Sequence, residues 1–300
     1  MGAPPLRLLC YGEVLWDLIE GVPHLGGAPF NVAAHASRLG VEAWLMSAVG
    51  DDELGLRALS EIRRHGIKSE LVQVLPGVPT GTVAVTLHAG GQPSYVIHEG
   101  VAWDRIAAEE GRLSKLGDLG FSMLVYGSLA QRAPASRACL DRVRKTLLDV
   151  PGFFDVNLRQ NFYDRETLEA SLASATFLKL NGDEVGVLSR LLFGLPVAHA
   201  EFCRLARDRY GIDLVIVTLG AQGALVADAE GVRQAPGDPV KVVDAVGAGD
   251  AFSAAFLQGQ LSGMDPLSAV SRANRLGAYV AGQRGAVPEY DRRILEDLEI

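Results

Sequence analysis

The sequence predicts an α/β fold in which helices cover both faces of a mainly parallel sheet. Short apolar segments, most of them bounded by glycine, recur along the 300 residues, and amphipathic segments with helical periodicity lie between them. This alternation is typical of parallel strands joined by crossover helices, because such strands are buried on both faces. With 48% hydrophobic residues, the chain can bury the large core that this sheet requires.

Six segments have the length and apolar character of buried strands: residues 6–12, 43–50, 123–127, 152–157, 177–181 and 214–220. Four amphipathic segments are expected to be helices: residues 54–65, 135–148, 201–210 and 251–261. Gly66 and Gly211 follow two of these helices, and Pro134 lies near the first turn of another, which favours these boundaries. No linker divides the chain, so residues 1–300 are expected to form one domain.

One region departs from this alternation. Residues 82–88 and 94–99 alternate apolar and polar side chains around the tip Ala-Gly-Gly-Gln at 89–92, the pattern of a hairpin with one solvent-exposed face. Together with residues 13–26, the region 80–103 could form a small β flap over the edge of the sheet. The alternative is a surface hairpin that gates nothing.

Charge and cysteine content limit the partners. A net charge of -8 argues against nucleic acid, because phosphate backbones are bound by clustered Lys and Arg. The three cysteines, Cys10, Cys139 and Cys203, lie far apart and suggest neither disulfides nor a zinc site. No apolar run reaches the roughly 18 residues of a membrane span. We expect a cytoplasmic protein without a membrane partner.

The strongest motif is Asp-Ala-Val-Gly-Ala-Gly-Asp at residues 244–250, directly before the helix expected at 251–261. The small residues Gly247, Ala248 and Gly249 let the backbone approach an anion, and a helix N-terminus stabilises negative charge. The negative charge of Asp250 would oppose a bound phosphate, unless this residue takes a proton from an attacking hydroxyl. The alternative is that Asp250 is a plain helix N-cap.

A second motif suits a polyol. Gly26 and Gly27 precede Asn31, and paired glycines followed by an amide let hydroxyls approach backbone and side-chain partners closely. Asp17, just before, could accept hydrogen bonds from two neighbouring hydroxyls. The alternatives are a helix-start residue for Asn31 and a solvated carboxylate for Asp17.

Three weaker signals follow other strands. Thr218, Gly220 and Gly223 form a turn against which a nucleotide could lie. Asn181 and Glu184 could orient Mg²⁺ through water, or could simply be an N-cap and a first-turn acid.

The last of these signals is Arg159, in an Asp-x-Asn-x-Arg element. It could hold a substrate oxygen or the phosphoryl group, or form a surface ion pair. The sequence contains no P-loop, no Gly-x-Gly-x-x-Gly fingerprint and no His-Glu-x-x-His motif.

These motifs resemble the ribokinase-like PfkB carbohydrate kinases over essentially the whole chain. Gly26, Gly27 and Asn31, followed by Gly40 and Gly50, resemble the N-terminal signature of the family. Residues 246–250 resemble its C-terminal signature, in the expected order and separation.

The resemblance implies a ribokinase-like three-layer sandwich with a small β lid that closes over sugar and often forms a homodimer interface. It implies ATP and Mg²⁺ as cofactors, Asp250 as the catalytic base, and Gly247, Ala248 and Gly249 as an anion hole. The implied sugar contacts are Asp17, Gly26, Gly27, Asn31 and Arg159. The implied nucleotide and phosphate residues are Lys179, Asn181, Glu184, Thr218, Gly220, Gly223 and Asn274, with Glu184 near Mg²⁺.

One departure concerns a monovalent cation. Family members usually carry Thr or a similar residue where this chain has Ala245, so a hydroxyl that could stabilise the loop is missing. This puts in doubt the potassium-type site that some relatives build, whose ligands would be Asp244, Val246 and Gly285.

The run from Gly26 to Ala33 and the Asp-x-Asn-x-Arg element look more like fructokinases than ribokinases or adenosine kinases. We therefore expect D-fructose as the acceptor and fructose 6-phosphate as the product. A 2-keto-3-deoxygluconate kinase, using Arg159 for the substrate carboxylate, or another PfkB sugar kinase is the alternative. A non-catalytic sugar- or nucleotide-sensing protein is more remote, and a nicotinamide-dependent dehydrogenase lacks its glycine fingerprint.

Overall fold

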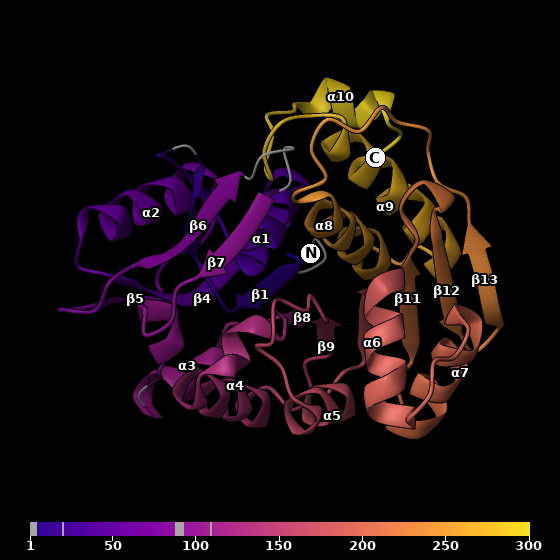
Figure 1. Ribbon diagram of the computed structural model, residues 1–300, viewed down its shortest axis with the longest axis horizontal. Coiled ribbons are helices and arrows are strands. Elements are labelled where there is room, and N and C mark those ends of the chain that lie inside the picture. The colour runs from indigo at the N-terminus through magenta and orange to yellow at the C-terminus, as the bar shows by residue number, and fades with distance from the viewer. Residues whose placement is uncertain (1–4, 20, 88–92, 109) are drawn as a thin grey trace.

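The computed structural model describes residues 5–19, 21–87, 93–108 and 110–300 (Figure 1). Its main feature is a nine-stranded sheet with the order β13-β12-β11-β10-β9-β8-β1-β4-β5. All neighbouring strands run parallel except β11–β12 and β12–β13, which are antiparallel. The strands are β1 (Arg7–Tyr11), β4 (Glu42–Gly50), β5 (Val72–Leu75), β8 (Met123–Tyr126), β9 (Gly152–Asp155), β10 (Phe177–Asn181), β11 (Leu214–Thr218), β12 (Ala224–Asp228) and β13 (Gly231–Ala235).

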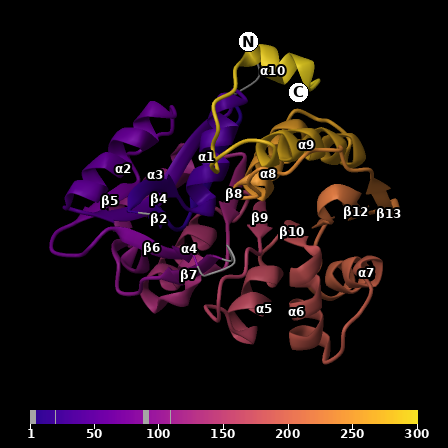
Figure 2. The same ribbon diagram turned by 45° about the horizontal axis from the view of Figure 1, so that its top comes forward.

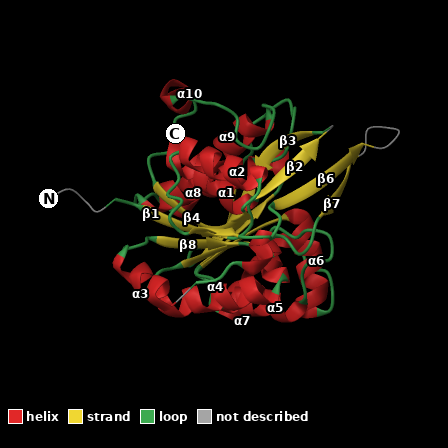
Figure 3. Cartoon of the chain, turned by 90° about the vertical axis from the view of Figure 1, so that its left-hand side faces the viewer, coloured by secondary structure: helices red, strands yellow, loops and turns green. Residues whose placement is uncertain are grey.

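Helices cover both faces of this sheet (Figure 3). One face carries α1 (Ala28–Arg38), α2 (Glu53–Arg64), α8 (Ala248–Leu261) and α9 (Pro266–Ala281), with α10 (Arg292–Asp297) outside them. The other face carries α3 (Glu110–Asp118), α4 (Pro134–Thr146), α5 (Arg165–Ala173), α6 (Gly182–Phe193) and α7 (His199–Tyr210). The predicted α/β fold with helices on both faces is confirmed.

Strand alternation divides the core into two layers. In β1, Leu8 and Cys10 pack with α1 and α8, whereas Leu9 and Tyr11 pack with the helices of the other face. Side chains of successive strand residues point to opposite faces, so one buried strand supplies both layers. Within the first layer α8 lies beside α9, as Figure 2 shows.

The predicted strands and helices are present, with shifted ends. The helix expected at 251–261 begins at Ala248, so the small residues of the motif lie inside its first turn. Strands β12 and β13 were not predicted, and they form the antiparallel edge of the sheet.

A second, four-stranded sheet lies beside the large one, with the order β3-β2-β6-β7 (Figure 3). Its strands are β2 (Leu15–Ile19), β3 (Val22–Gly26), β6 (Gly81–Leu87) and β7 (Pro93–Ile97). The segments expected to form a β flap therefore pair with each other, although the hairpin tip at 88–92 lies outside the described residues. That this sheet acts as a lid stays a prediction.

Two further observations concern the cysteines and the helices. Cys10, Cys139 and Cys203 are all buried and free. Among the described residues, no helix combines the length and the apolar character that crossing a membrane would need.

Candidate active site

The parallel sheet brings the predicted residues to its carboxyl edge. Strands β9, β10 and β11 end at Asp155, Asn181 and Thr218, and Asn181 pairs with Thr218 in register. Ligands of open α/β sheets bind outside the carboxyl ends of the strands. Residues that lie tens of positions apart in the sequence therefore meet along one edge.

The N-terminus of α8 lies at this site. Its N-cap is Gly247, in the left-handed region with φ of 80°, and among the described side chains none caps this end. A Cβ on Gly247 would lie 2.3 Å from the carbonyl oxygen of Ala286, so only glycine fits. Asp250 lies in the first turn. The alternative role of Asp250 as N-cap is therefore wrong, and the helix end is open to another acceptor.

Asp250 joins the two signature motifs. Its Oδ2 accepts a hydrogen bond of 2.8 Å from Nδ2 of Asn31, which lies in the first turn of α1. Only 9% of Asp250 is exposed, and burial, followed by the charge of Asp155, raises its pKa to about 6. Asn31, Lys179 and Arg159 act in the opposite direction. A carboxylate with this pKa is ionised at neutral pH and can still accept a proton.

Two further carboxyl groups share the influence of Arg159. Burial raises the pKa of Glu13 to about 7 and that of Asp17 to about 6, and the charge of Arg159 lowers both. The same charge acts on Asp250. The structure thus brings Asp17, Arg159 and Asp250 together and adds Glu13, a buried acid that the sequence motifs did not single out.

The paired glycines lie against these acids. A Cβ on Gly26 would lie 2.8 Å from Oδ2 of Asp17, and one on Gly27 would lie 2.4 Å from the backbone oxygen of Glu13. Gly27 also has φ of 109° and is the N-cap of α1. Gly27 therefore requires glycine, because its neighbour is backbone, whereas at Gly26 the neighbour is the end of the Asp17 side chain.

Lys179 forms a buried ion pair with Asp155. Its Nζ lies 3.0 Å from both carboxylate oxygens, and Ser253 of α8 donates a hydrogen bond of 2.9 Å to Oδ2. Sequence reasoning named Asp155 only as the first residue of the Asp-x-Asn-x-Arg element, without a role, and missed Ser253. A carboxylate at the end of a predicted strand was the available signal for Asp155, and the apolar helix gave none for Ser253.

Asn181 and Glu184 form a capping box at the start of α6. Glu184 Oε2 accepts from the Asn181 backbone N–H at 2.8 Å, and Asn181 Oδ1 accepts from the Glu184 N–H at 2.9 Å. Glu184 Oε1 accepts from the Leu158 N–H at 2.8 Å. The capping alternative is therefore observed. Each oxygen keeps a lone pair, so the fit to a water-mediated cation is retained.

The residues expected near a nucleotide surround one loop. Gly223 has φ of 88°, and a Cβ there would lie 2.1 Å from the Ala235 carbonyl oxygen. Asn274 donates to the neighbouring Pro236 carbonyl at 2.9 Å. Thr218 donates to Leu180 at 3.4 Å, and a Cβ on Gly220 would have nothing within 4 Å. Gly223 and Asn274 thus shape the loop, and the turn at Gly220 is open.

Asp244 connects the two loops expected to hold a monovalent cation. Its carboxylate accepts hydrogen bonds from the N–H groups of Val246 at 3.0 Å and Gly285 at 3.1 Å. The three predicted residues are therefore neighbours. These bonds fix the loops without the hydroxyl that Ala245 lacks.

A buried histidine supports the cap of α8 and was missed from the sequence. His35 of α1 contacts the Tyr290 hydroxyl through Nδ1 at 2.7 Å and the Ala286 carbonyl through Nε2 at 3.0 Å. A carbonyl only accepts, so Nε2 carries the proton. Burial lowers the pKa of His35 to about 4. This neutral ring holds Ala286 against Gly247.

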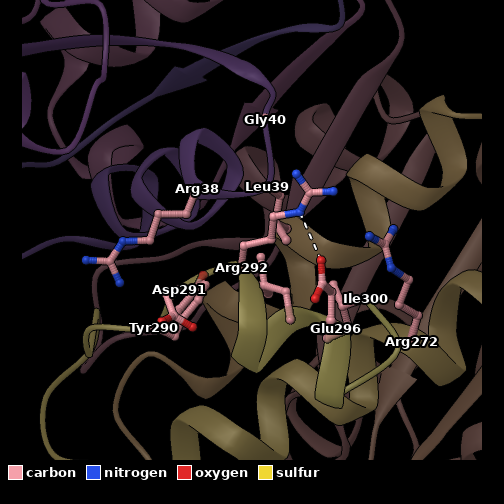
Figure 4. A pocket seen from close by; sticks show the side chains of 10 residues that line it. Arg38, Leu39, Gly40, Arg272, Tyr290, Asp291, Arg292, Glu296 and Ile300 are labelled. Atoms are coloured by element: carbon pink, nitrogen blue, oxygen red, sulfur yellow. Dashed lines mark hydrogen bonds and ion pairs between the residues drawn. The ribbon is translucent and has the colours of Figure 1, made fainter.

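A cavity of about 510 Å³ lies elsewhere, between the C-terminal end of α1 and α10 (Figure 4). Arg38, Arg272 and Arg292 line it, and Arg292 is paired with Glu296 at 3.0 Å. It contains none of the predicted site residues. The seven-residue step from Asn31 to Arg38 spans about 10 Å of helix axis, so this cavity is separate from the site.

Comparison with known proteins gives one family over nearly the whole chain. Residues 6–292 match the model of the pfkB family carbohydrate kinases. The aminoimidazole riboside kinase of Salmonella typhimurium is 30% identical over 276 residues, which cover 87% of this chain and 83% of that protein. The fructokinase of Escherichia coli is 29% identical over 295 residues, 92% and 93% of the two chains.

A solved structure agrees with these matches. A double mutant of the Vibrio cholerae fructokinase, with fructose, ADP and a potassium ion bound, has a TM-score of 0.83 and 26% sequence identity. The match covers 98% of both chains. The relatives carry the names of different sugar kinases at similar identity, so the similarity does not determine the acceptor.

Proposed function

Because this chain belongs to the pfkB family of carbohydrate kinases, we propose that it transfers the terminal phosphoryl group of ATP to a sugar hydroxyl with Asp250 as general base. The observation that carries the proposal is the position of Asp250. Its carboxylate is buried in the first turn of α8, bonded to Asn31, with its pKa raised to about 6.

The proposed reaction is an in-line displacement. Asp250 takes the proton of the acceptor hydroxyl while the hydroxyl oxygen forms a bond to the γ-phosphorus. The bond from that phosphorus to the bridging oxygen breaks, which releases ADP. Asn31 orients the carboxylate of Asp250. The backbone of Gly247, Ala248 and Gly249, at the open end of α8, would stabilise the charge that moves.

We place the sugar between the paired glycines and Arg159. Asp17 and Asn31 would bond its hydroxyls, and Gly26 and Gly27 let it approach the backbone. D-fructose is the proposed acceptor and fructose 6-phosphate the product. For 2-keto-3-deoxygluconate, the alternative acceptor, the exposed Arg159 would pair with the substrate carboxylate.

We place ATP along the turn after β11 and the loop that Asn274 holds. Thr218, Gly220, Gly223 and Asn274 would line the nucleotide, and Lys179 and Asn181 would lie near its phosphates. Glu184 would hold Mg²⁺ through water, and this ion neutralises phosphate charge when bound. Asp244, Val246 and Gly285 would hold a potassium ion, although Ala245 removes a supporting hydroxyl. Potassium-dependent turnover against a choline control tests that site.

The small sheet is the proposed lid and the proposed homodimer interface. Ile19, Val22 and Val96 expose 40%, 54% and 53% of their surface on three of its strands. Ile19 and Val22 pair in register on one face, whereas Val96 lies in register with Leu18 on the opposite face, so the proposed interface is tested at Val96. Val96→Glu should convert a dimer to monomers in sedimentation equilibrium. Leu148→Glu, at a more exposed site (82%) outside this sheet, should not, and a wild-type monomer would contradict the interface.

An acceptor panel tests the function. Purified protein with MgATP is offered fructose, ribose, 2-keto-3-deoxygluconate and aminoimidazole riboside, and ADP release is coupled to a spectroscopic readout. We expect ADP release with fructose and slower release with the others. Preference for the keto acid would select the alternative. If none of these acceptors gives ADP release, the proposed kinase activity is contradicted. The result would then favour a non-catalytic protein that senses sugar or nucleotide in the cytoplasm.

A further inference from the structure

The ion pair between Lys179 and Asp155 lies directly under the first turn of α8. The two residues face each other in register on β10 and β9, and 7% and 4% of them are exposed. Ser253 bonds Asp155 Oδ2 at 2.9 Å and the Gly249 carbonyl at 3.0 Å. A Cβ on Gly249 would lie 3.1 Å from Nζ of Lys179. The ammonium group therefore touches the turn that carries Asp250.

Stability alone explains this pair poorly. Taking two charges out of water costs several kcal/mol for each ion, roughly, and apolar side chains of similar volume often stabilise a fold as well or better. The strand neighbours of the pair, Phe153, Phe154 and Leu180, are buried and apolar. A buried ion pair at this position therefore needs an explanation other than stability.

Both charges act on Asp250. The positive charge of Lys179 lowers the pKa of Asp250, and the negative charge of Asp155 raises it. Burial alone would lower the pKa of Lys179, but the charges of Asp155, Glu184 and Asp250 outweigh burial and raise it. Lys179 therefore stays charged over the range in which Asp250 titrates.

We propose that Lys179 is a positioning residue, a fixed positive charge anchored by Asp155 and Ser253 that favours the ionised form of Asp250 and supports the anion-binding turn, and that it is not a ligand of the nucleotide. The proposal rests on the proposed function for its consequence in catalysis. Its geometric basis is independent of the substrate, because each contact lies within the protein.

The electrostatic surroundings of Asp250 limit the design of the test. The charged or polar groups that act on it come from several elements: Asn31 of α1, Glu13 after β1, Asp155 of β9, Arg159 after β9 and Lys179 of β10. Glu13 and Asp17 titrate close to the same range, so a single pH profile of activity mixes all three groups. The protonation of Asp250 is therefore best observed directly.

We suggest ¹³C NMR titration of the full chain with ¹³Cγ-labelled aspartate, in which the Asp250 signal is the one lost in Asp250→Asn. The expected result is a pair of opposite shifts. Lys179→Met should move the titration of Asp250 to higher pH, and Asp155→Asn should move it to lower pH. Lys179→Arg keeps the charge and should restore a titration close to that of the wild type.

Kinetics give the second readout. In Lys179→Met, kcat at pH 7 should fall by about 10-fold because a charge that stabilises the turn is lost. The Kd of ATP, measured calorimetrically, should change by less than about 3-fold because Nζ is already bonded to Asp155. The matched control is Arg132→Met, which breaks another buried ion pair and should leave the Asp250 titration unmoved.

Each outcome decides the proposal. Opposite shifts support it, whereas an unmoved Asp250 titration in Asp155→Asn overturns it even if Lys179→Met does not fold. A rise of more than about 10-fold in the Kd of ATP with an unmoved titration would instead make Lys179 a nucleotide ligand. Failure of the proposed kinase function can be distinguished from failure of this proposal. The NMR titration does not require turnover, so the shifts can be measured even if the wild-type protein is inactive.

Discussion

In the ion pairs Lys179–Asp155 and Arg132–Asp104 both side chains are buried, but the surroundings of the two pairs differ. Arg132 bonds both oxygens of Asp104, at 2.8 and 3.0 Å, and the His98 carbonyl at 2.6 Å. Its guanidinium lies 4.0 and 4.5 Å from the ring centroids of Trp103 and Phe162. Lys179 instead lies among carboxylates and beside a helix N-terminus.

The difference teaches what each pair can do. Arg132 joins the segment after β7, at the base of the small sheet, to the body of the protein through a planar, stacked and bidentate contact, which suits Arg. Within the described part of the chain, the contacts of Arg132 given above include no residue of the candidate active site. Lys179 is a compact point charge whose field reaches Asp250. The Arg132–Asp104 pair thus connects two parts of the fold, whereas the Lys179–Asp155 pair acts on Asp250 through its charges.

The largest effect is expected at the centre of the electrostatic region. Asp250→Asn removes the base while keeping the bond from Asn31 sterically possible, so kcat should fall by roughly 10²- to 10⁴-fold. ATP binding should persist, because the open end of α8 is unchanged. Calorimetry and steady-state kinetics on one preparation check both statements, and turnover like that of the wild type would remove Asp250 from its proposed role.

The next largest effect is expected for the Arg132–Asp104 pair, on stability. Arg132→Met leaves the Asp104 carboxylate buried and unpaired, so the free energy of unfolding should fall by about 3–5 kcal/mol. Urea denaturation measures this loss. The double variant Arg132→Met/Asp104→Asn should recover part of the loss, since no charge is then left unpaired.

The pH dependence of activity distinguishes the Arg132–Asp104 pair from Lys179. The pH dependence of the remaining kcat in Arg132→Met should be that of the wild type, unlike in Lys179→Met. A shifted pH profile in Arg132→Met would erase the distinction between the two pairs.

The smallest effect separates backbone strain from close contact at the two ends of α8. Gly263, just after the helix, has φ of 86° and an added Cβ would meet nothing within 4 Å. Gly263→Ala should therefore cost only the left-handed penalty, about 1–2 kcal/mol. Gly247→Ala adds the overlap with Ala286 and should cost about 1–3 kcal/mol more. Equal losses in urea denaturation would show that the Ala286 loop simply moves away.

Much of the fold and of the site could be predicted from the sequence because the signals are local. Apolar strands with intervening helices indicate the sheet, and Gly247, Gly249 and Asp250 lie together in one short motif. The start of α8 was placed three residues late, because an acidic residue before an apolar run resembles an N-cap whereas the actual cap is a glycine with positive φ.

What the sequence could not provide is register between distant strands. The pairing of Lys179 with Asp155 depends on how β10 aligns with β9, and the approach of Ser253 depends on how α8 crosses the sheet. His35 gave no local sign that it would hold Ala286. The edge strands β12 and β13 were missed for a different reason: they pair locally, but the two residues between them, Ala229 and Glu230, are not a typical hairpin turn pair.

The most direct measurement of the central claim is the pH dependence of kcat/KM for the phosphorylated sugar. A base with a pKa of about 6 loses its function as it is protonated, so kcat/KM should fall tenfold for each pH unit below about 6. The same limb should persist in Glu13→Gln and in Asp17→Asn, which remove the two other acids of the site whose pKa is raised into this range. A profile that stays flat from pH 8 to about 5 would contradict the assignment of Asp250 as the base.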